Sequence, residues 1–268
     1  MSSNMTKLER EIKKYNIVSL TLARGSGSIH ASHDQRCLWP LCGKPMIQWA
    51  LEVAKASKYV NKVVLSCEDP EVLDVGKKIG VTVIPRVLTT VFNEPRDYNS
   101  GIFQRELPRS LFSGEPSVYT NYRDYCFYYL KEYESYVPHI QVGVAANEPL
   151  GRTESLDRLI EAFFEDEEAD HGICFYPIMP DIHIINPITN RPVPVLQSAG
   201  VDRQKSTPLY RSGALSIFGK ASKVSYGHSR LAYIIVSPDE GLDVHDEEDL
   251  ELAEFYMKKR QKEKEEKK

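Results

Sequence analysis

The apolar residues of this chain alternate between short continuous runs and helically spaced positions. The first run, Ile17–Leu22, is rich in apolar and β-branched residues and carries no charge, which predicts a buried strand. From Met46 to Ser57 the apolar residues recur at helical spacing, so they would form one side of a helix. Runs of both kinds continue in alternation along the chain, and this order favours an α/β fold with a largely parallel sheet.

The same criteria predict most of the other elements. Strands are expected at 62–66, 81–84, 140–145, 172–176 and 232–236, and helices at 70–79, 155–164 and 247–259. Residues 87–138 interrupt the pattern with a Pro- and Gly-rich piece and an aromatic helix, so we interpret them as a variable insertion or lid. Residues 178–200 are typical of a hairpin excursion. We therefore expect one domain over 15–257, between an N-terminal extension, 1–14, and a charged tail, 258–268.

Composition narrows the class of protein. With 268 residues, of which 41% are hydrophobic, the chain can bury a substantial core. No apolar run is long enough to span a bilayer and the N-terminus lacks a secretory leader, so we expect a cytoplasmic protein without a membrane partner. The five cysteines are an odd number without CxxC spacing, which predicts reduced thiols. A formal net charge of −4 argues against a nucleic-acid partner.

A glycine-rich loop follows the first predicted strand. It reads Ala23-Arg24-Gly25-Ser26-Gly27, and its backbone N–H groups could converge on an anion or on the edge of a base. Strand, glycine loop and helix in this order are the usual layout of a nucleotide site at the carboxyl end of a parallel strand. The spacing of neither a P-loop nor a dinucleotide fingerprint is present, so a simple tight turn stays open as the alternative.

Four collinear segments resemble the motifs of a known family. They are IVSLTLARGSGSIHASHDQRCLWPLCGKP (17–45), VNKVVLSCEDPEVLDVGKKIGVTVIPR (60–86), VDRQKSTPLYRSGALSIF (201–218) and LDVHDEEDLELAEFY (242–256), with a weaker match at 144–163. In this order they resemble the acylneuraminate (CMP-sialic acid) cytidylyltransferases, relatives of the CMP-3-deoxy-octulosonate synthetases. The resemblance covers most of 15–257. It implies a Rossmann-like, glycosyltransferase-A-like nucleotidyltransferase fold, a three-layer sandwich with a mostly parallel sheet and a hairpin excursion.

The resemblance also implies an activity and a set of site residues. The expected reaction is metal-dependent transfer of CMP from CTP to an acidic acceptor, with release of pyrophosphate, by a homodimer that uses the 178–200 excursion. The acceptor would be a nonulosonate-type sugar or a related carboxylate or phosphonate. CTP would bind at Leu22, Ala23, Arg24, Gly25, Ser26, Gly27, Arg36 and Asn147. The acceptor would bind at Arg203, Gln204, Tyr210 and Arg211. Asp243 and His245 would hold Mg²⁺, with Mn²⁺ or another divalent ion as the alternative, and Arg24, Arg36 and Asp243 would be catalytic.

The glycine loop departs from the family pattern. It lacks the family's first phosphate lysine and is about three residues longer, which adds His30 and His33. A loop histidine could donate to phosphate or accept a proton, although it is as often an ordinary surface residue. Arg36 stands at the position of the family's second lysine and could supply a phosphate contact, because a guanidinium never loses its charge. Cys37 replaces the asparagine that follows this lysine.

The predicted metal site departs as well. The family has Asp-x-Asp where this chain has Asp243-Val244-His245, and residues two apart in an extended segment share a face. A carboxylate suits magnesium, whereas an imidazole suits manganese, zinc or cobalt. Three interpretations stay open: a site with shifted metal preference, a magnesium site with a single carboxylate, or a site that is losing its function.

The acceptor side keeps its cationic residues but changes its surroundings. Arg203 would address a carboxylate, yet Ser212 and Ser216 replace an asparagine and a tyrosine, and Glu148 brings a bulkier charged group. The acceptor pocket is therefore expected to be reshaped. These departures keep a second hypothesis open, a relative that binds nucleotide or a partner protein without turnover. The third hypothesis is a nucleotidyltransferase that uses another base, or a glycosyltransferase.

Overall fold

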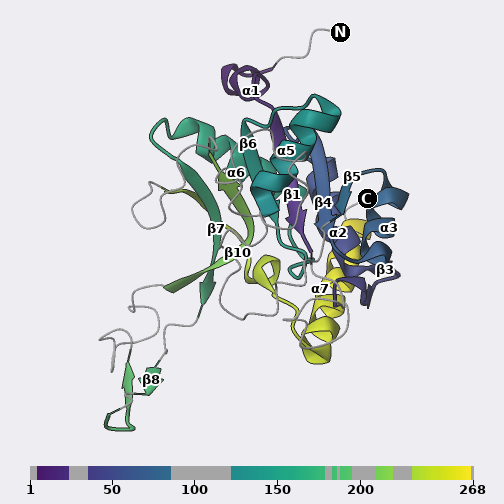
Figure 1. The fold of residues 1–268 in the computed structure, drawn as a ribbon. Coiled ribbons are helices and arrows are strands. Elements are labelled where there is room, and N and C mark those ends of the chain that lie inside the picture. The colour runs from purple at the N-terminus through teal and green to yellow at the C-terminus, as the bar shows by residue number, and fades with distance from the viewer. Residues whose placement is uncertain are drawn as a thin grey trace.

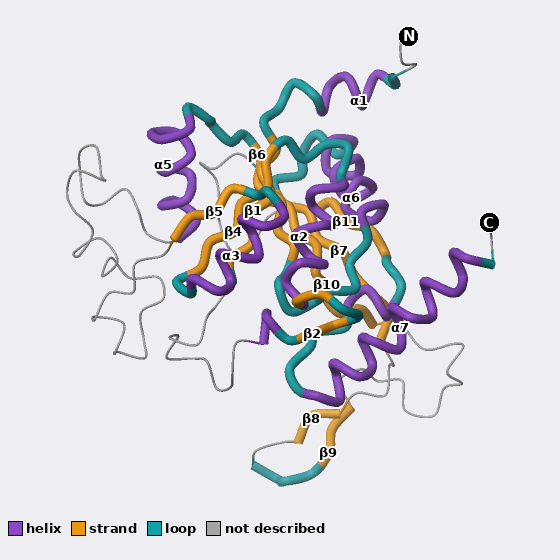
Figure 2. Tube along the Cα trace, turned by 90° about the vertical axis from the view of Figure 1, so that its right-hand side faces the viewer, coloured by secondary structure: helices purple, strands orange, loops and turns teal. Residues whose placement is uncertain are grey.

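The computed structural model describes residues 5–23, 36–85, 122–178, 183–185, 188–194, 209–219 and 231–266. Within these ranges a seven-stranded, mostly parallel sheet lies between helices that cover parts of both of its faces (Figures 1 and 2). The predicted α/β fold class with a mostly parallel sheet is confirmed.

The elements have the following bounds. The sheet consists of β1 (Ile17–Leu22), β4 (Lys62–Cys67), β5 (Thr82–Pro85), β6 (Ile140–Val144), β7 (His171–Ile178), β10 (Leu209–Phe218) and β11 (Leu231–Ile235). The helices are α1 (Lys7–Ile12), α2 (Met46–Ala56), α3 (Pro70–Ile79), α5 (Tyr122–Glu134), α6 (Thr153–Glu165) and α7 (Glu247–Glu265). The short elements are η1 (Arg36–Leu38), β2 (Pro40–Leu41), β3 (Lys44–Pro45), β8 (His183–Ile185), β9 (Pro192–Pro194) and η5 (Pro238–Gly241).

The strand order places a switch in direction at β1. The order is β11-β7-β10-β6-β1-β4-β5, so the chain builds outward from β1 through β4 and β5 and then continues on its other side with β6. β1 is parallel to both β4 and β6, whereas β10 is antiparallel to β6 and β7. In open α/β sheets, ligands bind outside the carboxyl ends of the strands at such a switch point. The end of β1 and the end of β6 are therefore the expected place for a site.

Two helical layers bury the centre of the sheet. α6 packs on β7, β10 and β11, with Leu156, Leu159 and Ile160 fully buried. On the other face α5 contributes Cys126 and Leu130 to a cluster with β1. Because helices cover both faces of the sheet here, β1 is buried at its first five positions, including Ser19 and Thr21.

Local signals determine the ends of α3, which coincide with the predicted range. Asp69 is the N-cap, and its side chain accepts a hydrogen bond from the backbone N–H of Glu71. Pro70 occupies the first turn, where its missing N–H costs nothing. Gly80 ends the helix in the left-handed region at φ 74°, a conformation that glycine adopts without strain.

Among the strands of the main sheet and the α-helices, β10 and α1 were not predicted from the sequence. β10 was recognised only as a family motif, but it is a ten-residue strand in the middle of the sheet, with an irregular register between Ser212 and Ser216. α1 lies within the predicted extension, where Thr6 and Glu9 form a capping box and Ile12 is buried against the core. Of the predicted insertion, the structure describes only the aromatic helix α5; residues 87–121 lie outside the described part.

A hairpin confirms the excursion that was predicted at 178–200. β8 and β9 pair in antiparallel fashion and project away from the sheet (Figures 1 and 2). Its role in dimerisation stays a prediction. None of the five cysteines, all of which lie in the described ranges, forms a disulfide bond. None of the described helices is both long and apolar enough to cross a bilayer.

Candidate functional site

Three segments meet at the carboxyl ends of β1 and β6. β1 ends at Leu22, and Ala23 is held by a hydrogen bond of 3.0 Å from its N–H to the carbonyl of Ser66 on β4. The loop after β6 contains Asn147, and residues 242–245 run from η5 to α7 beside it. Leu22, Ala23 and Asn147 thus lie where a nucleotide site is expected.

Part of the predicted site lies outside the described residues. This applies to the glycine loop with Arg24, Gly25, Ser26 and Gly27, to the histidines His30 and His33, and to Arg203 and Gln204. The roles of these residues stay predictions.

Asn147 and Asp243 join two of the three segments. The amide Nδ2 of Asn147 donates a hydrogen bond to Asp243 Oδ1, and the N–H of Val244 donates to the main-chain oxygen of Asn147 at 2.8 Å. Val244 is fully buried against Leu41 and Leu150. Because Val244 points into the core, its two neighbours in this extended segment point to the other side, toward the strand ends.

His245 lies directly against Asp243. Its Nε2 is 3.3 Å from Asp243 Oδ2, and its backbone N–H donates to Asp249 Oδ2 at 2.9 Å. The His245 side chain is 56% exposed, whereas that of Asp243 is 19% exposed. The two residues predicted to hold a metal are therefore neighbours.

The donor set of this pair limits which cation would fit. Among the described residues no three His, Cys, Asp or Glu side chains are grouped so that they could hold an ion. Two side-chain ligands leave most positions of a cation to water and to a substrate. Mg²⁺ is commonly bound in this way, with one or two carboxylates and substrate phosphates. Asp243 with His245 therefore fits a cation shared with a triphosphate better than an all-protein metal centre.

Arg36 connects the end of the glycine loop to this segment. It lies on η1, and its Nη1 donates a hydrogen bond of 3.1 Å to the main-chain oxygen of His245. The predicted phosphate contact of Arg36 stays a prediction. The structure adds a positioning contact that the sequence did not indicate, because it joins residues 209 positions apart.

Arg211 approaches the site from β10. Its Nη2 is 4.0 Å from Asp243 Oδ2, and its side chain is 61% exposed. Tyr210 precedes it on the strand, so the two side chains lie on opposite faces of the sheet. Of Tyr210 and Arg211, it is Arg211 whose side chain lies near Asp243.

Glu148 is a member of the site whose position the sequence did not reveal. Its Oε2 is shielded from solvent and has no hydrogen-bond partner among the described residues. Burial raises the pKa of Glu148 to about 8; the charge of Asp243 adds to this effect and Arg211 opposes it. The sequence showed only a bulky acidic residue next to Asn147. Its position after a core strand was the one available signal.

β7 borders the site on the side away from β1. A Cβ atom at Gly241 would lie 2.1 Å from two ring atoms of Tyr176, so only glycine lets η5 pass against this ring. Burial raises the pKa of Tyr176, and the nearby Arg211 opposes this shift. The contact places η5, and the segment that follows it, against β7.

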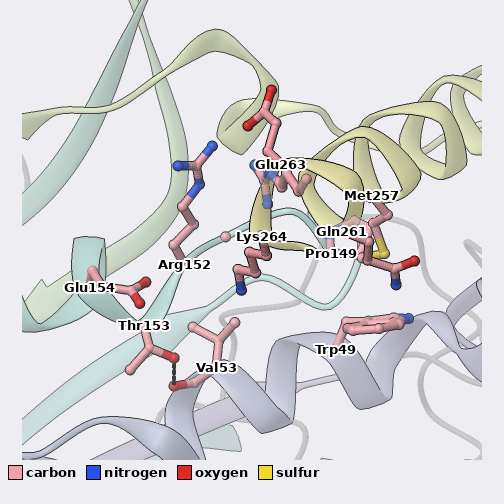
Figure 3. Close-up of a pocket in the computed structure, with 12 residues that line it drawn as sticks. Trp49, Val53, Pro149, Arg152, Thr153, Glu154, Met257, Gln261, Glu263 and Lys264 are labelled. Carbon is pink, nitrogen blue, oxygen red and sulfur yellow. Dashed lines mark hydrogen bonds between the residues drawn. The ribbon is translucent and has the colours of Figure 1, made fainter. Parts of the chain in front are cut away.

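A cavity of about 410 Å³ lies between the helices α2, α6 and α7 (Figure 3). Trp49, Val53, Arg152, Thr153, Met257 and Lys264 are among the residues that line it. Thr153 Oγ1 donates to the main-chain oxygen of Val53 at 3.1 Å, the dashed line in Figure 3. No predicted site residue lines this cavity. It is therefore distinct from the strand-end site.

The strand order and the strand-end site define an α/β fold with a mostly parallel seven-stranded sheet, and similar solved structures share this fold. The structure of CMP:2-keto-3-deoxy-manno-octonic acid synthetase complexed with CTP matches with a TM-score of 0.60 at 16% identity, over 91% of this chain and 99% of that chain. A 4-diphosphocytidyl-2C-methyl-D-erythritol synthase from Anaerococcus prevotii matches with a TM-score of 0.54 at 11% identity, over 91% and 99%. A second structure of that synthase matches with a TM-score of 0.55 at 14% identity, over 91% and 98%.

Sequence comparison adds a more specific similarity over part of the chain. Residues 35–91 match a family model described as Cytidylyltransferase. This range begins one residue before Arg36 and continues beyond β5. A search of curated proteins finds no match.

Proposed function

We propose that this protein is a metal-dependent cytidylyltransferase that transfers CMP from CTP to an acidic acceptor and releases pyrophosphate. The observation that carries the proposal is the contact of Asn147 with Asp243 at the switch point of the sheet. A match to the Cytidylyltransferase model at 35–91 supports the class, and a structural relative described as complexed with CTP supports the nucleotide.

On the nucleotide side, main-chain groups from Leu22 to Gly27 would receive the base and the phosphates. Arg24 and Arg36 would bind the triphosphate, because a planar guanidinium can make two parallel hydrogen bonds to phosphate oxygens. The bond from Arg36 to the His245 carbonyl places its guanidinium beside the segment of Asp243. The nucleotide would thus lie between β1 and this segment.

Asp243, with His245 beside it, would hold a divalent cation, Mg²⁺ or alternatively Mn²⁺, which supplies charge stabilisation to the triphosphate. The chain's own contribution to the reaction is positioning. An acceptor oxygen must approach the α-phosphorus opposite the leaving pyrophosphate, and fixed donors must stabilise the charge that develops. The hydrogen bond from Asn147 to Asp243 fixes the carboxylate for this purpose.

On the acceptor side, Arg211 would supply a positive charge. Tyr210, Arg203 and Gln204 would complete the pocket. A guanidinium at this position favours an acceptor with a carboxylate or a phosphonate. The β8–β9 hairpin would contact the second subunit of a homodimer.

The decisive experiment is CTP-dependent release of pyrophosphate with a panel of acids. The panel would contain N-acetylneuraminate, 2-keto-3-deoxy-manno-octonate and small phosphonates, and Asp243→Asn would be the inactive control. We expect release with CTP and at least one acid, and weaker binding of GTP than of CTP. Equal binding of both nucleotides would contradict the proposal.

A second function is favoured by two departures from the family pattern, the absence of the family's lysine from the glycine loop and the histidine, His245, in place of an aspartate. It is a protein that binds CTP without transferring CMP. CTP binding without pyrophosphate release, for every acid and for Mg²⁺ and Mn²⁺, would favour this second function.

A further inference from the structure

Glu148 has an unusual environment for an acidic residue. It follows Asn147 in the loop after β6, and its Oε2 is both shielded from solvent and without a hydrogen-bond partner among the described residues. Leaving a desolvated polar group without a partner destabilises a fold. A carboxyl group is retained in such a place at low cost only if something else binds it.

The position of Glu148 indicates which ligand it faces. Most of the expected nucleotide residues follow β1, whereas β10 and β7 lie on the other side of β6. The charge of Glu148 acts on Cys174 and Tyr176 of β7, and the charges of Arg211 and Asp243 act on Glu148. Glu148 is therefore near Asp243, Arg211 and β7. The N–H of Ala145, in the same loop, bonds the carbonyl of Ala214 on β10, so this loop borders the acceptor half of the site.

Glu240 provides a comparison within the same chain. It is 5% exposed, and its Oε2 also lacks a partner among the described residues. Its Oε1, however, accepts a hydrogen bond of 3.1 Å from Ser237 Oγ and lies 3.6 Å from Arg152 Nε. Glu240 is thus bound by its own fold through a hydroxyl and a guanidinium.

We propose that Glu148 is an acceptor-binding residue whose carboxyl group hydrogen-bonds a hydroxyl group of a polyhydroxylated acid, while the acidic group of the same molecule faces Arg211. This inference rests on the proposed function and narrows its acceptor class. A hydroxyl both donates and accepts, so it can pair with a carboxyl group in either protonation state. An acid without the hydroxyl would leave Glu148 unpaired and would be rejected strongly.

The test compares Glu148→Met, which keeps the length of the side chain and removes its polar atoms, with Glu240→Met and with Glu148→Gln. Without ligand, Glu148→Met is expected to raise Tm by about 2–4 °C, because it removes a shielded oxygen that has no hydrogen-bond partner among the described residues. Glu240→Met is expected to lower Tm, because Ser237 and Arg152 lose their acceptor. A lower Tm for Glu148→Met as well would overturn the inference.

The second measurement is kinetic. With the acid of the panel that wild type uses, Glu148→Met is expected to raise the KM for the acid at least about tenfold. The KM for CTP should stay within about twofold, and Glu148→Gln should recover most of the affinity for the acid. An unchanged KM for the acid would overturn the proposed role of Glu148 and would leave the proposed function standing. Wild-type protein that binds no CTP would instead overturn the proposed function, and the Tm comparison would still decide whether Glu148 is unpaired.

Discussion

The side chain of Asn147 donates a hydrogen bond to the carboxylate of Asp243, although the two residues are 96 positions apart in the sequence. A main-chain hydrogen bond from Val244 to Asn147 runs beside it. Together the two bonds hold the loop after β6 against the segment that leads into α7. The proposed cation and acceptor sites both depend on this junction.

Asn147→Asp tests the junction. A second carboxylate would replace the amide donor, so repulsion should lower Tm by roughly 3–8 °C at neutral pH. Mg²⁺ should recover part of the loss, because a cation between two carboxylates removes the repulsion. Thermal unfolding with and without Mg²⁺ measures both effects. Asn190→Asp, at an exposed turn of the hairpin, is the matched control and should change neither value.

The cation site predicts a metal preference. If Asp243 and His245 hold the ion, His245→Asp should raise activity with Mg²⁺ relative to Mn²⁺ and Co²⁺, since a carboxylate oxygen replaces an imidazole nitrogen. Asp243→Asn should reduce metal-dependent activity by at least about a hundredfold. Pyrophosphate release measured separately with Mg²⁺, Mn²⁺ and Co²⁺ tests this metal preference. If His245→Ala is as active as wild type with Mg²⁺, the histidine has no metal role.

The glycine loop predicts a nucleotide contact. Arg24→Ala should weaken CTP binding by at least about tenfold, because a charge-assisted contact to phosphate is lost. Tm should change by less than about 2 °C, since a loop arginine contributes little to a core. Calorimetric titration with CTP checks the affinity. Arg10→Ala, at an exposed position of α1, is the control and should bind CTP normally; an unchanged affinity for Arg24→Ala would place the nucleotide elsewhere.

Glu148 predicts a pH dependence of stability. Because burial raises the pKa of Glu148 from its usual value of 4.5 to about 8, the folded protein holds this proton more tightly than the unfolded chain does. Its contribution to stability is therefore present at acidic pH and is lost as the pH rises toward 8. Glu148→Gln removes this dependence, so the Tm of the variant relative to wild type should rise between pH 5 and 8. A constant difference in Tm across this range would contradict the raised pKa.

Several elements could be predicted because their signals are local. For α3 the capping residue, the proline at the first turn and the terminal glycine all lie within the helix or next to it. The apolar and β-branched run of β1 similarly indicated a buried strand, and its first five positions are buried. The extended spacing of Asp243 and His245 indicated that their side chains would share one side, and the structure places them in contact.

β10 could not be predicted by the same means. Its pairing with β6 and β7 is antiparallel within an otherwise parallel sheet, and its register is irregular between Ser212 and Ser216. A break in the alternation of a strand removes the periodic signal from the sequence. The motif resemblance therefore identified this segment, but it did not reveal its position beside β6.

The sequence by itself determined the α/β class and most of the elements, because patterning acts over a few neighbouring positions. Its resemblance to a known family indicated the candidate roles of Asp243, His245 and Arg211. Only the tertiary structure decided that Asn147 bonds Asp243, that Arg36 bonds the His245 carbonyl and that Oε2 of Glu148 is shielded without a hydrogen-bond partner among the described residues. These relationships depend on strand order and on loop paths that bring distant segments within hydrogen-bonding distance. The physical reason is that burial and hydrogen bonding are properties of the packed chain, and no local pattern encodes them.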